Sequence, residues 1–284
     1  MRRLALSVLA GPLAYARIAP ARTFLFVLLV CLLTAVTQIG GLVLWFCVPA
    51  FIRLDGRLGN YGLAPRVAAA VMLFTTAYLA ASLAVVPLAG AFGRVPLDCG
   101  LVGKTAYAPR SFLTCLFNRH YATMPARQAL QQISAEFSAD FGGSRVIYLD
   151  AGLPFFGWFP MIPHLSHGDG RKVDLALIYG GDSATPSPIG YWGFVQPRPG
   201  DPRPCTANAG WLRWDMSWLQ PLLPRAELDE SRTAKLVHAL AGSPRVKRIL
   251  MESHLQRRLG LDHPKIRFQG CRAARHDDHI HVEF

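Results

Sequence analysis

The first third of the chain contains two long stretches of apolar residues without a single charge. The first covers residues 23–52 and the second covers residues 67–93. Since about 20 apolar residues are enough to cross a bilayer, the pattern predicts two transmembrane helices, near residues 24–48 and 68–92. A buried core helix or a signal peptide is also apolar, but both are usually shorter. Residues 1–94 are therefore interpreted as a membrane anchor.

The remaining residues, 95–284, alternate between helical and extended patterns and are numerous enough to bury a core of their own. Ala129, Ile133 and Phe137 recur at four-residue steps, which is typical of a helix. Ser243, followed by a proline, marks the start of the last predicted helix. The predicted elements are a helix over 125–141, strands over 145–150 and 173–179, a loop over 180–210, helices over 227–241 and 243–259, and a strand over 279–284. Because helices and strands alternate irregularly, the predicted fold class is α+β.

Composition favours a membrane-bound protein over a disordered or nucleic-acid-binding one. Hydrophobic residues make up 51% of the chain and charged residues only 17%, against about 25% charged in an average soluble domain. The net charge is +12, and much of the excess arginine flanks the apolar stretches, as is common beside anionic lipids. The sequence has no basic stripe with interleaved aromatic residues, so a nucleic-acid partner is not expected.

The six cysteines divide into two groups. Cys31 and Cys47 lie in the first apolar stretch, where a free thiol behaves as a small apolar side chain. Four others lie in the predicted soluble domain, and none forms a Cys-x-x-Cys pair: Cys99, Cys115, Cys205 and Cys271. This even number favours two disulfides in an oxidising compartment over four reduced thiols in the cytosol. The sequence allows three pairings and does not choose among them.

Five of the nine histidines lie in two short motifs, PHLSHGDGRKVD (163–174) and RHDDHIHVEF (275–284). These are His164 and His167 in the first motif, and His276, His279 and His281 in the second. On a strand, a His-x-His pair points both rings to one face, and a loop can fold His167 back beside Asp174. Two imidazoles, a carboxylate and an open fourth position describe a catalytic zinc site, although the same ligands suit other metals. Incidental histidine clusters remain the alternative, and the isolated His120, His238, His254 and His263 are interpreted as structural or surface residues.

In combination, the two histidine motifs resemble those of the penicillin-insensitive murein endopeptidases. That family belongs to a wider group that includes lysostaphin, D-Ala-D-Ala metallopeptidases and the hedgehog signalling domain, with the pattern His-x6-Asp followed later by His-x-His. The resemblance covers about residues 140–284, and the segment VKRILMESHLQRRL (246–259) also resembles the family in position and character. It implies a central antiparallel sheet that carries a zinc site.

The resemblance assigns the ligands position by position. It implies that His167, Asp174 and His281 bind Zn²⁺. Hydrogen bonds from neighbouring groups usually orient ligand imidazoles, and Asp169 and Asp277 are candidates to supply them.

The resemblance also implies the catalytic groups. His279 takes the place of the first histidine of His-x-His and is expected to act as the base or to stabilise the transition state. Asp278 is a second candidate for the base. His276 and His164 match positions near the metal, where they would contact the substrate or support the ligands. The aromatic segments 154–160 and 191–194 are candidate cleft walls around a peptide stem, with ordinary packing as the alternative.

The sequence thus predicts a membrane-anchored zinc metallopeptidase that cleaves peptide cross-links of peptidoglycan, with peptide stems and the lipid bilayer as its partners. The cysteines and this substrate favour a catalytic domain on the periplasmic side of the cytoplasmic membrane. Charge weakly favours the reverse, because four arginines precede the first apolar stretch and three lie between the stretches. Two alternatives stay open: another D,D-peptide or protein substrate, and an inactive zinc-dependent binding domain.

Overall fold

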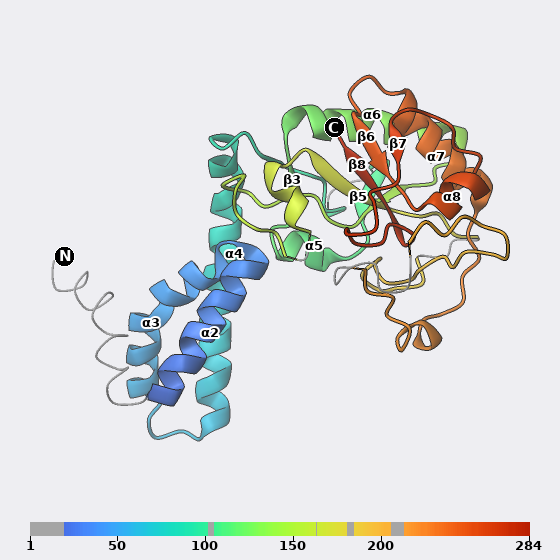
Figure 1. Cartoon of the computed structure of the whole chain (residues 1–284). Helices are drawn as coiled ribbons and strands as arrows, with labels where there is room; N and C mark the ends of the chain where they lie inside the picture. The colour runs from blue at the N-terminus through green and yellow to red at the C-terminus, as the bar shows by residue number, and fades with distance from the viewer. Residues whose placement is uncertain (1–19, 102–104, 163, 181–184, 206–212) are drawn as a thin grey trace. The chain divides into compact units, whose positions relative to one another are not determined.

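The computed structural model describes five parts of the chain: residues 20–101, 105–162, 164–180, 185–205 and 213–284. By its internal contacts the chain forms two compact units. The first consists of Met1–Phe92 with Phe159–Leu165, and the second consists of Gly93–Trp158 with Ser166–Phe284. Each unit is described by itself below (Figure 1).

The first unit is helical, and its first predicted helix is interrupted. The prediction of one helix over 24–48 is wrong, because α2 (Pro20–Thr37) ends and α3 (Gly40–Arg57) begins within it. Gln38 adopts a positive φ of 66° at the break. Gly41 lies where α3 passes close to α2, and a Cβ atom there would clash with Thr34 Oγ1 and the Val30 carbonyl. The chain therefore folds back on itself inside its first uncharged stretch.

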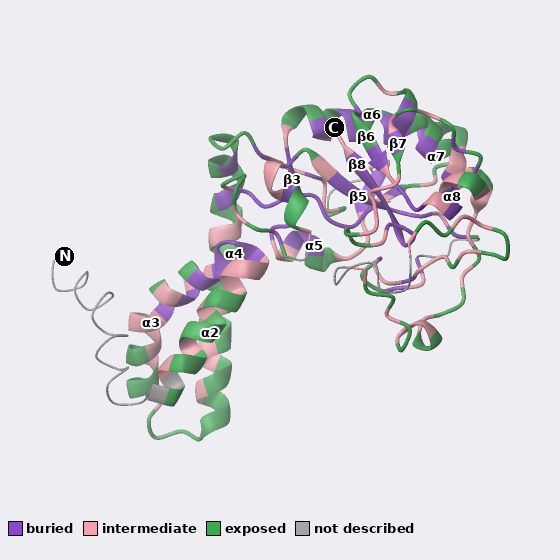
Figure 2. Ribbon diagram, viewed as in Figure 1, coloured by how far each residue is buried: buried purple, intermediate pink, exposed green. Residues whose placement is uncertain are grey.

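The helix predicted over 68–92 is present as α4 (Leu63–Gly90), which contains most of these residues. It is long and apolar enough to cross a membrane, and most of its side chains are not buried in the protein (Figure 2). Among the described residues it is the only helix that meets this test, since the apolar part of α2 is shorter. The structure thus shows one candidate span where the sequence predicted two.

A six-stranded sheet organises the second unit. Its order is β2-β4-β5-β8-β6-β7, formed by Tyr107–Pro109, Val146–Tyr148, Lys172–Ala176, His279–Glu283, Arg248–Leu250 and Ile266–Arg267 respectively. The four inner strands pair antiparallel, whereas the two outer pairs, β2 with β4 and β6 with β7, are parallel. The predicted antiparallel sheet is therefore correct at its centre, and the whole sheet is mixed. A separate two-stranded sheet joins β1 (Val95–Pro96) to β3 (Tyr121–Ala122).

Two amphipathic helices build the core with the sheet (Figure 1). They are α6 (Met124–Asp140) and α7 (Glu230–Gly242), close to the predicted 125–141 and 227–241. The hydroxyl of Thr123 and the carboxylate of Asp229 accept N–H bonds from the first turns of these helices, which satisfies otherwise unpaired donors. Leu130 and Leu240 are fully buried in a cluster that also contains strand residues. The second unit combines helices with a mixed sheet, which agrees with the predicted α+β class.

The predicted helix over 243–259 is wrong. Ser243 is the C-cap of α7 instead of an N-cap, the segment then forms strand β6, and α8 is limited to Ser253–Arg258. β6 pairs with β8 on one side and β7 on the other, and Ile249 is fully buried there. Long-range strand pairing has overridden the local helical signal, as it often does for short apolar runs. The described part of the predicted loop, 185–205, forms neither helix nor strand.

The structure selects one pairing of the four cysteines. Cys99 bonds Cys115, and Cys205 bonds Cys271, which confirms the prediction of two disulfides. Cys31 and Cys47 are free. The second disulfide joins residues 66 positions apart and links the long loop region to the segment just before the second histidine motif. In the chain-entropy view, closing a loop of this length is worth up to about 4 kcal/mol.

Replacing Cys205 and Cys271 by serine should therefore lower the free energy of unfolding of the second unit by about 2–4 kcal/mol. Thermal unfolding of the full chain in detergent, followed by near-ultraviolet circular dichroism, measures the change. Cys31→Ser is the matched control, because this thiol is exposed and free, and its midpoint should stay at the wild-type value. Equal midpoints for all three proteins would show that the long disulfide contributes no stability.

Candidate metal centre

The central strand pair of the sheet brings the predicted site residues together. Asp174 on β5 lies directly opposite His281 on β8, and His279 lies two residues earlier on β8. Side chains alternate along a strand, so Ile280 and Val282 point the other way and are fully buried in the core. The prediction that His-x-His presents both rings to one face of the sheet is confirmed.

A short 3-10 turn, η1 (Leu165–Asp169), positions His167. The Arg94 guanidinium donates hydrogen bonds to the carbonyls of Gly168 and Asp169 and so fixes the end of the turn. Gly170 has a positive φ of 67°, and a Cβ atom there would strike Arg94. At Gly152 a Cβ atom would lie 3.1 Å from the His167 carbonyl oxygen. Glycine is needed at both positions for the turn to pack closely against Arg94 and the segment at Gly152.

Three ligand atoms converge on one point: His167 Nε2, Asp174 Oδ1 and His281 Nδ1. The separations are 3.3 Å between the two nitrogens, 3.2 Å between His167 and Asp174, and 2.8 Å between His281 and Asp174. All three side chains are almost fully buried. Ligand atoms of a tetrahedral zinc site, at bonds of about 2.0–2.1 Å, lie about 3.3 Å apart. The observed spacing fits a bound divalent metal.

Hydrogen bonding sets which nitrogen of His167 is available. His167 Nδ1 donates to the Ala151 carbonyl oxygen at 2.6 Å, and in the neutral ring this leaves the lone pair on Nε2, the atom that faces Asp174 and His281. Metal-binding histidines commonly use one nitrogen for the metal and donate the other N–H to such a group. Two imidazoles with a carboxylate suit zinc, but this donor set also suits other divalent metals.

The electrostatic surroundings shift the pKa values of two of these side chains. Burial alone would raise the pKa of Asp174, but His167 and His279 lower it well below the usual range, so the carboxylate is ionised. Burial lowers the pKa of His281, against the opposing effect of Asp174, and this favours the neutral imidazole. An ionised carboxylate beside a neutral imidazole is the state that binds a cation.

Within the described residues of the second unit, two further groups of residues have metal-ligand chemistry. His276, His279 and His281 each bring a ring nitrogen within 4.8 Å of the others, and His281 belongs to both possible ligand sets. Cys99, Cys115 and His120 also lie close together. Because the two sulfurs of that group are bonded to each other, they are not available as thiolate ligands.

His279 is held in one orientation by Asp278. His279 Nδ1 donates to Asp278 Oδ1 at 2.5 Å, and the second oxygen of Asp278 accepts the Trp192 N–H at 2.6 Å. His279 Nε2 is then directed to the ligand side, 3.8 Å from Asp174 Oδ1. Burial would lower the pKa of His279, but Asp174 and Asp278 raise it to about 9. A divalent cation beside Asp174 would offset that carboxylate and lower the pKa again.

Asp174 has a second contact that the sequence analysis missed. The Tyr191 hydroxyl donates to Asp174 Oδ2 at 2.8 Å and lies 3.5 Å from Asp150 Oδ2. Asp150 is paired with Arg119 through two hydrogen bonds of 2.7 and 2.9 Å. Tyr191 therefore occupies one oxygen of Asp174 and leaves Oδ1 for the ligand cluster. Tyr191 lies in a segment that was predicted only as an aromatic wall.

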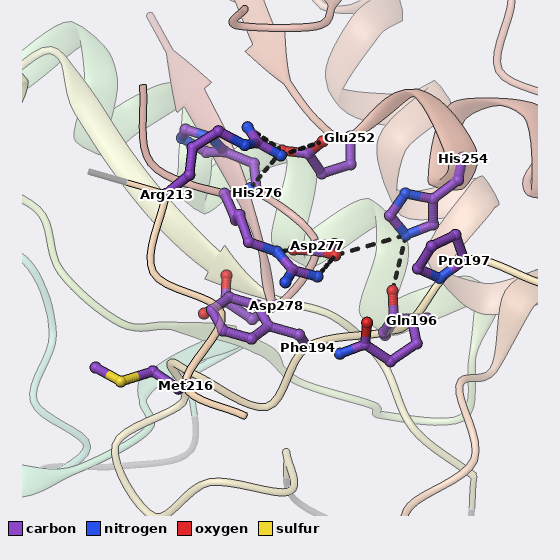
Figure 3. Close-up of polar contacts among 12 residues, drawn as sticks. Phe194, Gln196, Pro197, Arg213, Met216, Glu252, His254, His276, Asp277 and Asp278 are labelled. Carbon is purple, nitrogen blue, oxygen red and sulfur yellow. Dashed lines mark hydrogen bonds and ion pairs between the residues drawn. The ribbon is translucent and has the colours of Figure 1, made fainter. Parts of the chain in front are cut away.

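His276 lies beside the cluster, at the edge of a buried ionic network (Figure 3). Its ring centroid is 4.8 Å from that of His279 and 5.4 Å from that of His281. Its main-chain N–H donates to Glu252 Oε1 at 3.3 Å, and Glu252 in turn accepts two bonds from Arg213 at 3.1 Å. The prediction that His276 lies near the ligands agrees with this position.

The two aspartates suggested as orienting groups have other partners. Asp277 is bonded to Arg275 and lies 3.6 Å from His254 Nε2 (Figure 3). Burial raises the pKa of Asp277 to about 6, against the lowering effect of Arg275. Asp169 binds Lys172 and the Arg171 N–H. The groups that orient the ligands are instead the Ala151 carbonyl and the Tyr191 hydroxyl, which no sequence spacing marks.

His164 falls outside this unit by its contacts. It lies in the segment Phe159–Leu165, which groups with the helical unit, and it is partly buried. Its predicted position beside the metal therefore stays a prediction.

Two comparisons with known proteins found no match. No model of a protein family matches the chain, and no curated protein matches its sequence. The resemblance to the murein endopeptidases therefore depends on the two histidine motifs.

Single histidine substitutions should separate the two possible ligand sets. If His167, Asp174 and His281 bind the metal, His167→Ala and His281→Ala should each abolish binding, because a tetrahedral site has few ligands to lose. His276→Ala should keep one equivalent of metal. Elemental analysis of the purified full-length variants measures the content. Metal lost from His276→Ala but kept by His167→Ala would assign the ion to the histidine triad instead.

Tyr191→Phe should lower the metal affinity by about 10-fold, the usual scale for groups that orient a ligand. The ring remains, but Asp174 Oδ2 loses its donor, so the carboxylate is no longer held in one orientation. Competition with a coloured chelator gives the dissociation constant. The control is Tyr148→Phe, because the Tyr148 hydroxyl donates to the Asp98 carbonyl at 2.9 Å and its loss should leave the affinity unchanged. Equal affinities for all three proteins would contradict the role given to Tyr191.

Proposed function

We propose that this protein is a membrane-anchored zinc metallopeptidase that hydrolyses amide bonds in the peptide cross-links of peptidoglycan. The observation that supports this most strongly is the convergence of His167 Nε2, Asp174 Oδ1 and His281 Nδ1 within 2.8–3.3 Å of one another. Beside them lies His279, a further imidazole that Asp278 holds in place. Three metal ligands and a neighbouring base are the groups that metal-assisted amide hydrolysis requires.

Each residue has a distinct task in this proposal. A zinc ion held by His167, Asp174 and His281 would polarise the scissile carbonyl and lower the pKa of a bound water to about 7. His279 Nε2 accepts the proton of the attacking water and passes it to the leaving amine. Asp278 keeps the imidazole aligned and stabilises its protonated form. Because both Asp278 oxygens already accept hydrogen bonds, His279 is a better base than Asp278.

The compartment and the anchor agree with a cell-wall substrate. Two disulfides in the second unit suit an oxidising environment outside the cytoplasm. The apolar helix α4 ends at Gly90, a few residues before the second unit begins at Gly93. The proposal therefore places the anchor in the cytoplasmic membrane, with more than one pass, and the catalytic unit on the periplasmic side. The resemblance to murein endopeptidases supplies the substrate class.

An inactive zinc-dependent binding domain is the second candidate, because intact ligands alone do not require catalysis. The fixed contact between His279 and Asp278 favours the enzyme. An imidazole outside the preferred ligand set that is buried and paired to a carboxylate is placed to act as a base, and metal retention by the other three residues does not need it.

The test uses the full-length protein in detergent with purified cross-linked muropeptides, and the products are identified by mass spectrometry. We expect cleavage at an amide bond of the cross-link, loss of cleavage with chelator and recovery with added Zn²⁺. His279→Ala should keep its metal and lose activity by about 100-fold or more, the scale of general base catalysis. His238→Ala is a matched control away from the motifs and should behave like wild type.

The outcomes separate the candidates. Metal-loaded wild-type protein without activity on any muropeptide, or His279→Ala with full activity, would refute the proposed peptidase. Bound metal with tight muropeptide binding but no turnover would favour the binding domain.

A further inference from the structure

A loop beside the proposed site exposes large aromatic side chains. Residues 213–222, here called the tryptophan loop, contain Trp214 and Trp218, which are 48% and 69% exposed. Leu222 at its end is 73% exposed. Tryptophan is usually well buried because its ring has a large apolar surface. Two exposed indoles four residues apart therefore call for a function.

The first end of the tryptophan loop is fixed next to His276. Arg213 donates two hydrogen bonds of 3.1 Å to Glu252, which also accepts the His276 N–H (Figure 3). Glu252 is only 3% exposed and Arg213 is largely covered. A buried two-bond ion pair of this kind positions a backbone segment closely.

The other end of the tryptophan loop is fixed next to Asp278. Gln220 Nε2 donates to the Trp192 carbonyl at 2.5 Å, and Gln220 Oε1 accepts the Phe194 N–H at 3.3 Å. The Trp192 N–H in turn binds Asp278. The loop therefore borders the catalytic side chains and is held at both ends.

We propose that Trp214 and Trp218 bind sugar rings of the glycan strand that carries the peptide stem. This inference rests on the proposed function and extends it from the peptide to the glycan. The face of a pyranose ring carries C–H groups that pack flat on an aromatic ring, while its hydroxyls need polar partners at the edge. Asp215 and Ser217 alternate with the indoles and are exposed. Rigid indoles beside small polar groups give a large contact at low entropic cost.

The charge of the loop disfavours a membrane surface as the occupant. Residues 214–222 contain no lysine or arginine and one acidic residue, Asp215. Arg213 is neutralised by Glu252. Segments that bind anionic lipid surfaces usually carry several basic residues. A neutral sugar has no such requirement, so the glycan is the better match for this loop.

The test measures binding of an N-acetylglucosamine hexamer to the chelator-treated full-length protein by isothermal titration calorimetry. The combined variant Trp214→Ala, Trp218→Ala should bind about 10-fold more weakly than wild type, a scale typical of two lost ring contacts. Leu222→Ala is the matched control, because it removes exposed apolar surface from the same loop without removing a ring. It should bind like wild type, and Trp218→Phe should lie between.

This measurement needs neither metal nor turnover, so failure of the peptidase proposal would not decide it. Where the peptidase is active, KM for a glycan-bearing cross-linked substrate should also rise about 10-fold in the double variant. KM for the matching glycan-free cross-linked peptide should be unchanged.

Equal hexamer affinity for wild type and the double variant would overturn the inference. So would quenching of tryptophan fluorescence by brominated lipids in nanodiscs that disappears in the double variant, because that result would place the indoles in the bilayer.

Discussion

The antiparallel pairing of β5 with β8 is the constraint on which the site depends. It sets Asp174 opposite His281 and brings His279 onto the same face. The same two strands present Ile280 and Val282 to the core. Since a slip of one residue exchanges the two faces of a strand, burying the core in this register is also what assembles the ligand atoms. Stability and chemistry are therefore set by one pattern of alternation.

Around this strand pair, ordinary hydrogen bonds and close packing position the side chains of the site. Arg94 and two glycines fix the turn that carries His167, and a carbonyl, a tyrosine hydroxyl and a carboxylate orient three side chains. The loops that supply these contacts have little regular structure, but a long disulfide and buried ion pairs tie them down. Irregular segments can hold a precise site when their ends are fixed in this way.

Sequence patterns predicted the parts of the fold that depend on local order. The four-residue apolar period located α6, and alternation located β5, because each signal lies within the element itself. The strand at Arg248–Leu250 was missed since its partners, β7 and β8, lie further along the chain. The break between α2 and α3 was missed because hydropathy alone does not register a turn at Gln38 between apolar segments.

The candidate site shows the same division. His167, Asp174 and His281 were predicted together because the two histidine motifs resemble those of a known metallopeptidase family, and the structure does bring these side chains together. Tyr191 and the Ala151 carbonyl were not, since any loop residue or backbone oxygen can supply a hydrogen bond once the chain has folded. Likewise, which cysteines pair is decided by how the loops are laid over the sheet.

The distance in sequence between the two central strands has a kinetic consequence. Asp174 and His281 are 107 residues apart, so closing β5 on β8 costs far more chain entropy than forming α6 or α7. Contacts of this separation form slowly and only after local structure has shortened the effective loop. The ligand cluster is therefore expected among the last features to appear as the chain folds, and a collapsed intermediate with both helices in place would still lack it.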